Sequence, residues 1–243
     1  MDVYWMEQTE SDMPSEHRWL STNEMAVLCS MHFPKRRSDW RLGRWTAKLA
    51  ASACLNLPID FDALSHLEIR SASSGAPEAL LGGQPAPISI SISHSAGTAF
   101  CTVAPFGTSL GCDIEEIDPR SAAFIADYFT AEEKALITRT QLDERTLLVN
   151  LLWSGKESAL KALHVGLRID TRWVCLSPTD TRFGSAAGEG QDLYPVSQAN
   201  PDGWHPLSGR YSGDHILRGW WRSQDRWVRT VISDLPQRVP VRA

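Results

Sequence analysis

The spacing of apolar positions predicts helices and strands that alternate along the chain. From Ile88 to Ile92, apolar and polar residues alternate strictly, as they do in a half-buried strand. Apolar residues recur at helical spacing from Arg37 to Leu55 and again from Glu144 to His164, which predicts two amphipathic helices. Further helices are predicted over 22–31, 121–129 and 130–140, strands over 3–6, 99–104, 110–114 and 174–176, and a hairpin over 218–232.

Three stretches lack such a pattern. Residues 71–87 and 177–209 are rich in Gly, Pro and Ser, which predicts loops, and the tail after Pro236 is predicted to fray. The remaining elements fall into two groups, each a helix beside a small antiparallel sheet. We therefore expect an α+β fold with an N-terminal subdomain over 1–108 and a C-terminal subdomain over 109–243, packed as one compact unit.

Composition narrows the class of protein. With 243 residues and 42% hydrophobic content, the chain can bury a core without disulfides or metals. A net charge of −5 and a pI near 5.8 argue against a general binder of nucleic acids or anionic membranes. The sequence shows no signal peptide and no stretch long enough to cross a bilayer, so we expect a cytoplasmic protein.

The five cysteines are scattered, odd in number and free of any Cys-x-x-Cys pair. This distribution indicates neither a zinc site nor a disulfide framework. Cys112 is expected to face the core as a small hydrophobic side chain, without a redox role.

Candidate chemistry concentrates in two short motifs, one on a predicted strand and one on a predicted helix. Strand side chains alternate between faces, so Asp113 and Glu115 share a face. Helical spacing places Glu157 and Lys161 one turn apart. Carboxylates beside fixed cations suit Mg²⁺ with a phosphate or pyrophosphate. Taken singly, each pattern is more often a solvated strand or helix face, and only the combination favours a metal site.

The chain resembles the Sfp-type 4′-phosphopantetheinyl transferases in these motifs, Gly111–Glu115 (Gly-x-Asp-x-Glu) and Trp153–Lys161 (Trp-Ser-x-Lys-Glu-Ser-x-x-Lys). Upstream, Gly83-Gln84-Pro85, Ile90–Ser95 and the basic stretch from Pro34 to Arg44 are similar to further segments of that family. In order and spacing the resemblance spans about residues 30 to 176. It implies two similar subdomains related by a pseudo-twofold axis, with the site in the cleft between them.

The resemblance also implies an activity. Members of the family transfer the 4′-phosphopantetheine group of coenzyme A to a serine of an apo acyl or peptidyl carrier protein, and release adenosine 3′,5′-bisphosphate. Phosphoryl transfer of this kind depends on positioning and on neutralising charge, which are tasks for Mg²⁺ and cationic side chains. We expect a monomer whose partner is a carrier protein of fatty-acid, polyketide or non-ribosomal peptide biosynthesis.

Roles then follow for individual residues. The resemblance implies that Mg²⁺ is held by Asp113, Glu115 and Glu157. We expect Glu157 to be the general base, either directly or through a metal-bound water, and Asp113 and Lys161 to complete the catalytic set. Coenzyme A is expected to contact Lys35, Arg36, Arg44, Gln84, Pro85, Ser93, His94, Asp113, Lys156 and Lys161. Among these, Lys161 and Lys156 would hold phosphate oxygens, and His94 and Ser93 would donate hydrogen bonds. The 3′-phosphate would be bound by Lys35 and Arg44, with Arg36 and Arg37 beside them.

One departure from the family pattern keeps alternatives open. Gln84 stands where the family has a basic residue, so one ionic contact to the nucleotide is missing or is supplied by another arginine. A non-catalytic relative that binds coenzyme A or a nucleotide is therefore the second hypothesis, and a Mg²⁺-dependent phosphohydrolase is the third. An aromatic stripe, formed by Phe124, Tyr128 and Phe129, is expected to pack in the core or to face the carrier protein.

Overall fold

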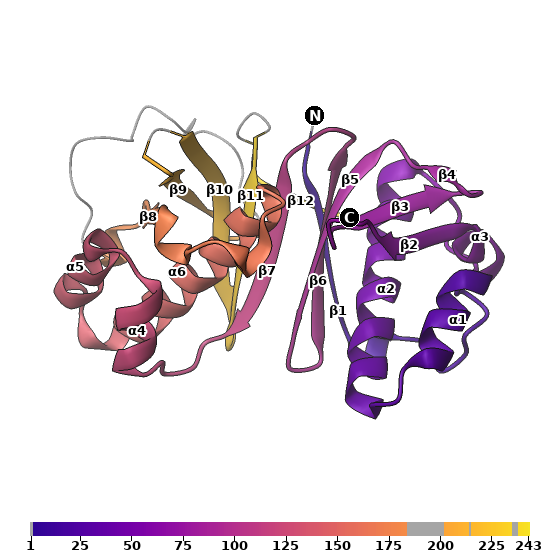
Figure 1. The fold of residues 1–243 in the computed structure, drawn as a ribbon, viewed down its shortest axis with the longest axis horizontal. Helices are drawn as coiled ribbons and strands as arrows, with labels where there is room; N and C mark the ends of the chain where they lie inside the picture. The colour runs from indigo at the N-terminus through magenta and orange to yellow at the C-terminus, as the bar shows by residue number, and fades with distance from the viewer. Residues whose placement is uncertain (1, 184–201, 214, 235–237) are drawn as a thin grey trace. The chain divides into compact units, whose positions relative to one another are not determined.

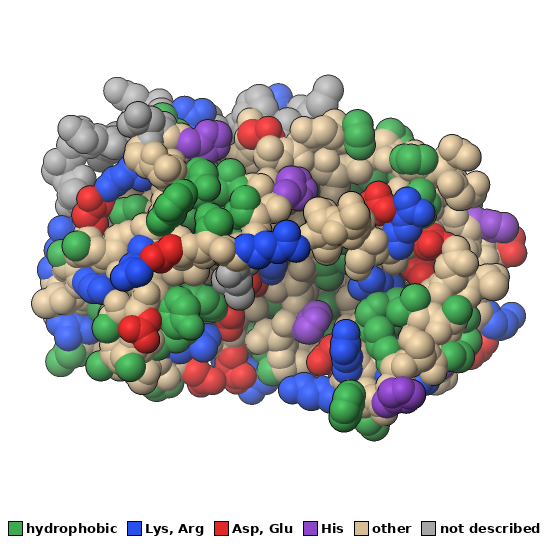
Figure 2. All heavy atoms as spheres, in the orientation of Figure 1, with side chains coloured by type: hydrophobic (Ala, Val, Ile, Leu, Met, Phe, Trp, Pro, Cys, Tyr) green, Lys and Arg blue, Asp and Glu red, His purple; other side chains and the backbone are tan. Residues whose placement is uncertain are grey.

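The computed structural model describes residues 2–183, 202–213, 215–234 and 238–243. The chain forms two compact units: unit 1 comprises Met1–Leu110 with Pro240–Ala243, and unit 2 comprises Gly111–Val239. The boundary expected from the sequence, between residues 108 and 109, lies two residues earlier, and the sequence did not indicate that the last four residues join unit 1. In Figure 2, acidic and basic side chains are interspersed over the visible face.

Unit 1 is built on a four-stranded sheet covered by one long helix (Figure 1). The strand order is β12-β1-β6-β5, in which β12 pairs parallel with β1 and the other pairs are antiparallel. The bounds are β1 Tyr4–Thr9, β5 Ile88–Ser95, β6 Thr98–Pro105, β12 Val241–Arg242 and α2 Pro34–Leu55. Small residues let α2 approach closely, because Ala47, Ala50 and Ala51 join Ile88, Ile90 and Val103 in one buried cluster.

A second, three-stranded sheet of unit 1 corrects one prediction. Its order is β2-β3-β4, with bounds Leu67–Ser71, Pro77–Leu81 and Gln84–Pro85. The loop expected over 71–87 is therefore wrong in its second half. Gly82 and Gly83 both have positive φ and connect the paired residues Leu81 and Gln84, which is the two-residue turn that joins antiparallel strands. The unit also contains η1 Glu10–Asp12, α1 Thr22–Ser30 and α3 Phe61–His66.

Unit 2 is a five-stranded sheet packed on α6. The strand order is β7-β11-β10-β9-β8, and the three pairs from β11 to β8 are antiparallel. The bounds are β7 Leu110–Glu116, β8 Val174–Pro178, β9 His205–Tyr211, β10 His215–Gln224, β11 Trp227–Ser233, α4 Ala122–Tyr128, α5 Ala131–Arg139 and α6 Leu142–Ala162, with short 3₁₀ turns η2 Gly166–Arg168, η3 Thr171–Trp173 and η4 Thr181–Phe183.

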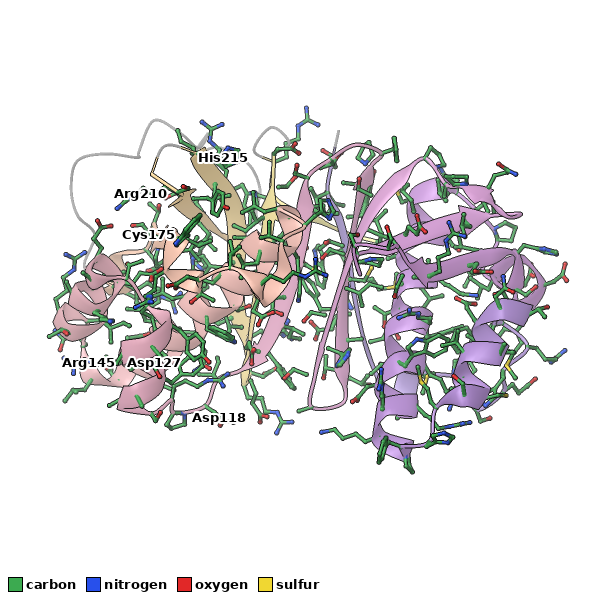
Figure 3. All side chains as sticks on the ribbon, in the orientation of Figure 1. Asp118, Asp127, Arg145, Cys175, Arg210 and His215 are labelled. Carbon is green, nitrogen blue, oxygen red and sulfur yellow. The ribbon has the colours of Figure 1, made fainter. Side chains whose placement is uncertain are left out.

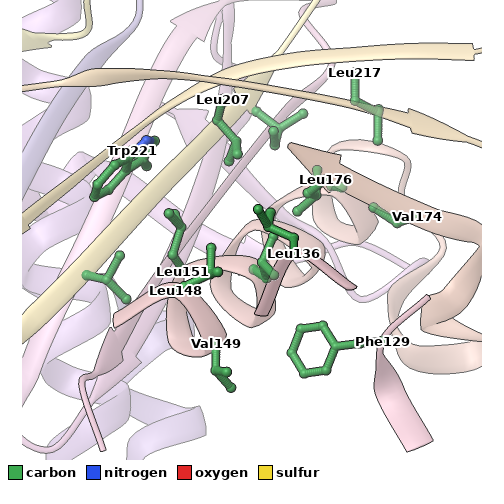
Figure 4. Packing of buried hydrophobic residues seen from close by; sticks show 14 of the residues in the cluster. Phe129, Leu136, Leu148, Val149, Leu151, Val174, Leu176, Leu207, Leu217 and Trp221 are labelled. Atoms are coloured by element: carbon green, nitrogen blue, oxygen red, sulfur yellow. The ribbon is translucent and has the colours of Figure 1, made fainter. Parts of the chain in front are cut away.

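The core of unit 2 lies between this sheet and its helices. Leu148, Leu151 and Leu152 of α6 are fully buried, together with Leu207 and Trp221 of the sheet (Figure 4). Burying a side chain of this size stabilises the fold by about 1.5–3 kcal/mol, so the cluster anchors α6 firmly on the sheet. This anchoring fixes the orientation of the polar face of α6.

A buried ion pair of the same construction occurs in each unit. In unit 1, Glu24 lies in the first turn of α1 and accepts hydrogen bonds from the backbone N–H groups of Ser21 (2.8 Å) and Ile69 (2.9 Å). Its partner is Lys48 of α2, whose Nζ lies 2.6 Å from the carboxylate and has no exposed side-chain surface. The ammonium also lies 5.6 Å from the centre of the Trp19 ring.

The counterpart in unit 2 is Glu133 at the start of α5. It accepts hydrogen bonds from the N–H groups of Thr130 and Leu176, each at 2.9 Å, and pairs with Lys156 of α6 at 2.9 Å. The Lys156 ammonium lies 5.7 Å from the centre of the Phe129 ring. In both units, one glutamate thus caps a helix, bonds a strand and neutralises a buried lysine.

The predicted fold class, α+β with antiparallel sheets packed on helices, is confirmed. The end of the chain differs from the prediction, because β12 pairs with β1 instead of fraying. Most of the expected loop over 177–209 lies outside the described residues, although β9 begins within it. No helix among the described residues combines the length and apolar character that crossing a bilayer requires.

Candidate active site

The strand β7 lies directly against α6. A Cβ atom on Gly111 would stand 1.9 Å from the carbonyl oxygen of Ser158 and 2.6 Å from the amide nitrogen of Ala162. Both are backbone atoms that cannot yield, so only glycine permits this approach. Because strand side chains alternate, Asp113 and Glu115 share the face of Gly111 and lie on the side of α6.

Asp113 and Lys161 form the innermost pair of the site. Lys161 Nζ lies 2.8 Å from Oδ1 of Asp113 and donates a second hydrogen bond, 3.0 Å long, to the carbonyl oxygen of Cys112. The Asp113 side chain is only 5% exposed, whereas that of Lys161 is 29% exposed. Although burial opposes the charge of Lys161, the Asp113 carboxylate raises the pKa of this lysine, so its ammonium stays charged.

Glu115 is held by two donors. Trp153 Nε1 donates to Oε1 at 3.0 Å, and Arg120 Nη2 donates to Oε2 at 2.9 Å. Burial and the charge of Asp113 raise the pKa of Glu115, while Arg120 and Trp153 oppose the rise. Arg120 follows β7 and Trp153 belongs to α6, so the two motifs meet at this carboxylate.

Glu157 completes the acidic group. It lies one turn before Lys161 on α6 and is partly buried. Burial raises its pKa most, the charges of Asp113 and Glu115 raise it further, and Lys161 lowers it. The three carboxyl groups therefore affect one another electrostatically, and Glu157 is a stronger proton acceptor than an exposed glutamate.

The donor set matches Mg²⁺ in its chemistry. It consists of hard carboxylate oxygens, and the mutual repulsion seen in the raised pKa values is what a divalent cation would relieve. Among the described residues, however, no three His, Cys, Asp or Glu side chains form a group that could hold a metal ion as they stand. Lys161 and Arg120 instead form ion pairs with two of the carboxylates.

Lys156 does not belong to this group. Its ammonium is fully buried, pairs with Glu133, and donates to the carbonyl oxygens of Thr171 (2.9 Å) and Val174. Burial lowers its pKa most, and the charge of Glu133 opposes this. The position argues against the predicted phosphate contact, because the ammonium has no surface from which to reach a ligand.

The predicted nucleotide contacts belong to unit 1. Lys35 and Arg36 lie in the first turn of α2, after Pro34, and are exposed. Arg44 is partly buried: its guanidinium lies 4.6 Å from the centre of the Trp40 ring, and its Nε donates to the carbonyl oxygen of Ile69 at 3.3 Å. The first turn of α2 thus presents two basic side chains to solvent, whereas Arg44 is partly engaged within the unit.

The other predicted contacts of unit 1 lie on β4 and β5. Gln84 and Pro85 are exposed, as is His94, while Ser93 is buried. A Cβ on Gly43 of α2 would meet Ile92 of β5 at 3.5 Å, so this face of β5 lies against the helix. His94 comes two residues later on the same face.

Two residues of the site were missed from the sequence. Arg120 binds Glu115, and Asn150 Oδ1 accepts a hydrogen bond from Arg120 Nε at 2.9 Å. Asn150 precedes Trp153 by three residues and Glu157 by seven, so helical spacing alone could have placed it on the same face. In the predicted aromatic stripe, Phe129 is fully buried, whereas Phe124 and Tyr128 contact Trp153.

Comparisons with known proteins bear on this arrangement. A family model described as the 4′-phosphopantetheinyl transferase superfamily matches residues 109–207. The 4′-phosphopantetheinyl transferase HetI of Nostoc sp. is 25% identical over 180 residues, which make up 72% of this chain and 73% of that protein. Both findings support the family that the motifs predicted.

Two solved structures also match. They are holo-(acyl-carrier-protein) synthases from Bacillus anthracis, in complex with CoA (3′,5′-ADP), and from Helicobacter pylori, in complex with coenzyme A. Their identities are 22% and 23%, their TM-scores 0.36 and 0.29, and each match covers 42% of this chain and 92% or 98% of the other. Similarity at these scores adds nothing to the assignment.

Proposed function

We propose that the chain, which matches the 4′-phosphopantetheinyl transferase superfamily over residues 109–207, transfers the 4′-phosphopantetheine group of coenzyme A to a serine of an apo acyl or peptidyl carrier protein. The reaction would require Mg²⁺ and release adenosine 3′,5′-bisphosphate. The observation that carries the proposal is the acidic group of Asp113, Glu115 and Glu157 beside Lys161, assembled entirely within unit 2.

In this proposal Asp113, Glu115 and Glu157 would hold Mg²⁺. The ion would supply positive charge at the pyrophosphate, where negative charge develops during phosphoryl transfer. Each carboxylate alone would repel an anionic substrate, and together they would repel it more strongly. The proposal therefore makes binding of the anionic substrate depend on the cation.

The protein's own groups do the remaining work. Glu157 accepts the proton of the attacking serine hydroxyl. Lys161 keeps its charge and donates to a pyrophosphate oxygen, while Asp113 orients the ammonium through the 2.8 Å ion pair. Proton acceptance and charge stabilisation thus come from positions one turn apart on one helix.

Unit 1 would bind the nucleotide. Lys35 and Arg36 would take the 3′-phosphate, with Arg44 contributing less because it already engages Ile69 and Trp40. The exposed imidazole of His94 would donate to another phosphate oxygen, and Ser93, Gln84 and Pro85 would line its approach. We further propose that the enzyme acts as a monomer in the cytoplasm and binds neither nucleic acid nor membranes.

Mass spectrometry of carrier proteins tests the proposed reaction. The purified chain is incubated with coenzyme A, Mg²⁺ and a panel of fatty-acid, polyketide and peptide apo carriers, and at least one should gain the phosphopantetheine arm. Asp113→Ala and Glu157→Gln should abolish the gain. Glu116→Gln changes the opposite face of β7 and should leave it intact. A fully unmodified panel, or near-normal transfer by either site variant, would refute the assignment.

One observation favours a second candidate, a non-catalytic binder of coenzyme A. Gln84 is exposed on β4 and brings no charge to a position where the family has a basic residue. Calorimetry distinguishes the two: coenzyme A binding without modification of any carrier supports the binder. Modification of one carrier excludes it.

A further inference from the structure

We infer that Arg120 and Trp153 are positioning residues that orient the Glu115 carboxylate for the metal, and that Asn150 anchors them. This inference rests on the proposed function. Each carboxylate oxygen of Glu115 accepts one hydrogen bond, at 3.0 Å from Trp153 and at 2.9 Å from Arg120. A carboxylate has about four lone-pair positions, so both oxygens keep capacity for a cation.

Asn150 holds the Arg120 guanidinium in place at its Nε atom, while Nη2 of the same guanidinium bonds Glu115. The Asn150 side chain is fully buried and donates from Nδ2 to the carbonyl oxygens of Thr146 (2.9 Å) and Asp118 (2.7 Å). Its Oδ1 accepts from Arg120 Nε, so the amide cannot turn without losing hydrogen bonds in a buried place. Asp118 is labelled in Figure 3, in the segment that follows β7.

Aromatic packing fixes the other donor. The Trp153 ring meets Phe124 and Tyr128 of α4 edge to face, at centroid distances of 5.0 and 5.1 Å. The Arg120 guanidinium lies 5.2 Å from the centre of the Phe124 ring. The same aromatic group therefore supports both donors, and neither can swing away without breaking this packing.

The anchor belongs to a polar stripe of α6. Asn150, Trp153, Glu157 and Lys161 follow one another at intervals of three or four residues, which places them along one helix face. Lys161 holds Asp113 at one end of the stripe, and Asn150 holds Glu115 through Arg120 at the other. Two carboxylates of the strand are thus oriented from one rigid helix before any ligand arrives.

Arg120 alone does not distinguish orientation of Glu115 from competition with the metal, so the comparison with Trp153 decides between them. A guanidinium on Glu115 could compete with a cation, in which case removing it would strengthen metal binding. Trp153 is neutral and cannot compete in this way. Removal of its N–H group therefore reports orientation alone, and loss of such an outer hydrogen bond typically weakens metal binding by about 10- to 100-fold.

The test measures Mg²⁺ binding directly. Trp153→Phe removes the N–H donor and keeps an aromatic ring, though a smaller one, and Arg120→Lys keeps the charge and removes the planar guanidinium that joins Glu115 to Asn150. Matched controls are Trp173→Phe, an exposed tryptophan of the same unit, and Arg226→Lys, whose partner is Glu116, the next residue of β7. Calorimetric titration with MgCl₂ in the presence of coenzyme A gives the dissociation constant for each variant.

Both site variants should bind Mg²⁺ about tenfold or more weakly, need correspondingly more Mg²⁺ for half-maximal transfer, and lose less activity at saturating Mg²⁺. Both controls should match wild type. The indole N–H resonance that disappears in Trp153→Phe should shift in Glu115→Gln, which a tryptophan without this hydrogen bond would not show. Unchanged or tighter Mg²⁺ binding by Trp153→Phe overturns the inference, as does an unmoved resonance.

Measurements on wild type distinguish a failure of the positioning role from a failure of the proposed function. If wild type transfers the phosphopantetheine group and binds Mg²⁺ while both variants bind it equally well, only the positioning role fails. If wild type neither binds Mg²⁺ nor modifies a carrier, the proposed function fails and the positioning role fails with it.

Discussion

Lys156 and Glu133 form an ion pair 2.9 Å long in which neither side chain has exposed surface. Lys156 stands beside Glu157 in the sequence, yet it serves the interior of unit 2 and not the acidic group. Removing one partner leaves an uncompensated buried charge, which typically destabilises a protein by about 3–5 kcal/mol. We expect Lys156→Met to lower the free energy of unfolding by that amount, measured by urea denaturation.

A double variant checks this explanation. Adding Glu133→Gln to Lys156→Met removes the stranded charge and should recover part of the stability. The two N–H groups of Thr130 and Leu176 bond different oxygens of Glu133, and a glutamine amide keeps only one of these acceptors, so the recovery should be partial. If the loss of stability in the double variant equals the sum of the losses in Lys156→Met and Glu133→Gln alone, the pair is not the source of the effect.

The pH dependence of stability gives a second prediction. Burial and neighbouring charges raise the pKa of Glu157 in the folded chain, whereas the unfolded chain has the ordinary value of about 4.3. Between the two values the folded state binds more protons, so the free energy of unfolding falls as the pH rises. Glu157→Gln should therefore melt at a higher temperature than wild type at neutral pH, although the proposed function predicts that it is inactive.

The same experiment contains its check. Below a pH of about 4, Glu157 is protonated in both states, and the advantage of the variant should vanish. Thermal melting in EDTA at several pH values measures this, with Glu116→Gln as the control on the other face of β7. An advantage that persists at low pH would show that the substitution stabilises by another route.

The local part of the site was predictable because it depends on periodicity. Alternation along β7 placed Asp113 and Glu115 on one face, and helical spacing placed Glu157 beside Lys161. The glycine that opens the first motif also has a local cause, since only Gly111 lets the strand touch the helix. Such relations need no knowledge of distant residues.

The burial of Lys156 and the residues that hold Glu115 could not be predicted, because they depend on contacts between residues far apart in the sequence. Nothing near Lys156 shows that it faces the core, because its carboxylate partner lies 23 positions earlier, at Glu133, and its carbonyl partners lie 15 and 18 positions later. Arg120 and Asn150 are 30 positions apart. The β3–β4 hairpin differs from these, since its Gly82-Gly83 turn is a local signal that the overall Gly and Pro content obscured.

Two glycines of the motifs should respond oppositely to alanine. At Gly111 the new Cβ would overlap backbone atoms of α6, so Gly111→Ala should cost about 3 kcal/mol or more of stability and disturb the acidic group. At Gly43, within α2, the new Cβ meets only Ile92 at 3.5 Å, an ordinary contact. Helix propensity then predicts that Gly43→Ala stabilises by up to about 1 kcal/mol.

Denaturation curves for the two variants, under identical conditions, measure the contrast. Near-wild-type stability of Gly111→Ala would mean that β7 can move away from α6, and that the close approach is not required. Destabilisation by Gly43→Ala would show instead that α2 and β5 are packed more tightly than the 3.5 Å contact indicates.

Recognition of the 3′-phosphate gives the last prediction. Lys35 and Arg36 are exposed in the first turn of α2, where a phosphate can approach both. Their double substitution by alanine should weaken coenzyme A binding by about tenfold or more, since charge-assisted hydrogen bonds contribute about 1.5–3 kcal/mol each before solvent screening. Dephospho-coenzyme A lacks this phosphate, so its binding should change little.

The control Arg70→Ala removes an exposed arginine that already pairs with Glu78. Calorimetry should show that this control prefers coenzyme A to dephospho-coenzyme A as strongly as wild type does. Equal weakening toward both ligands in the double variant would place the 3′-phosphate elsewhere in the chain.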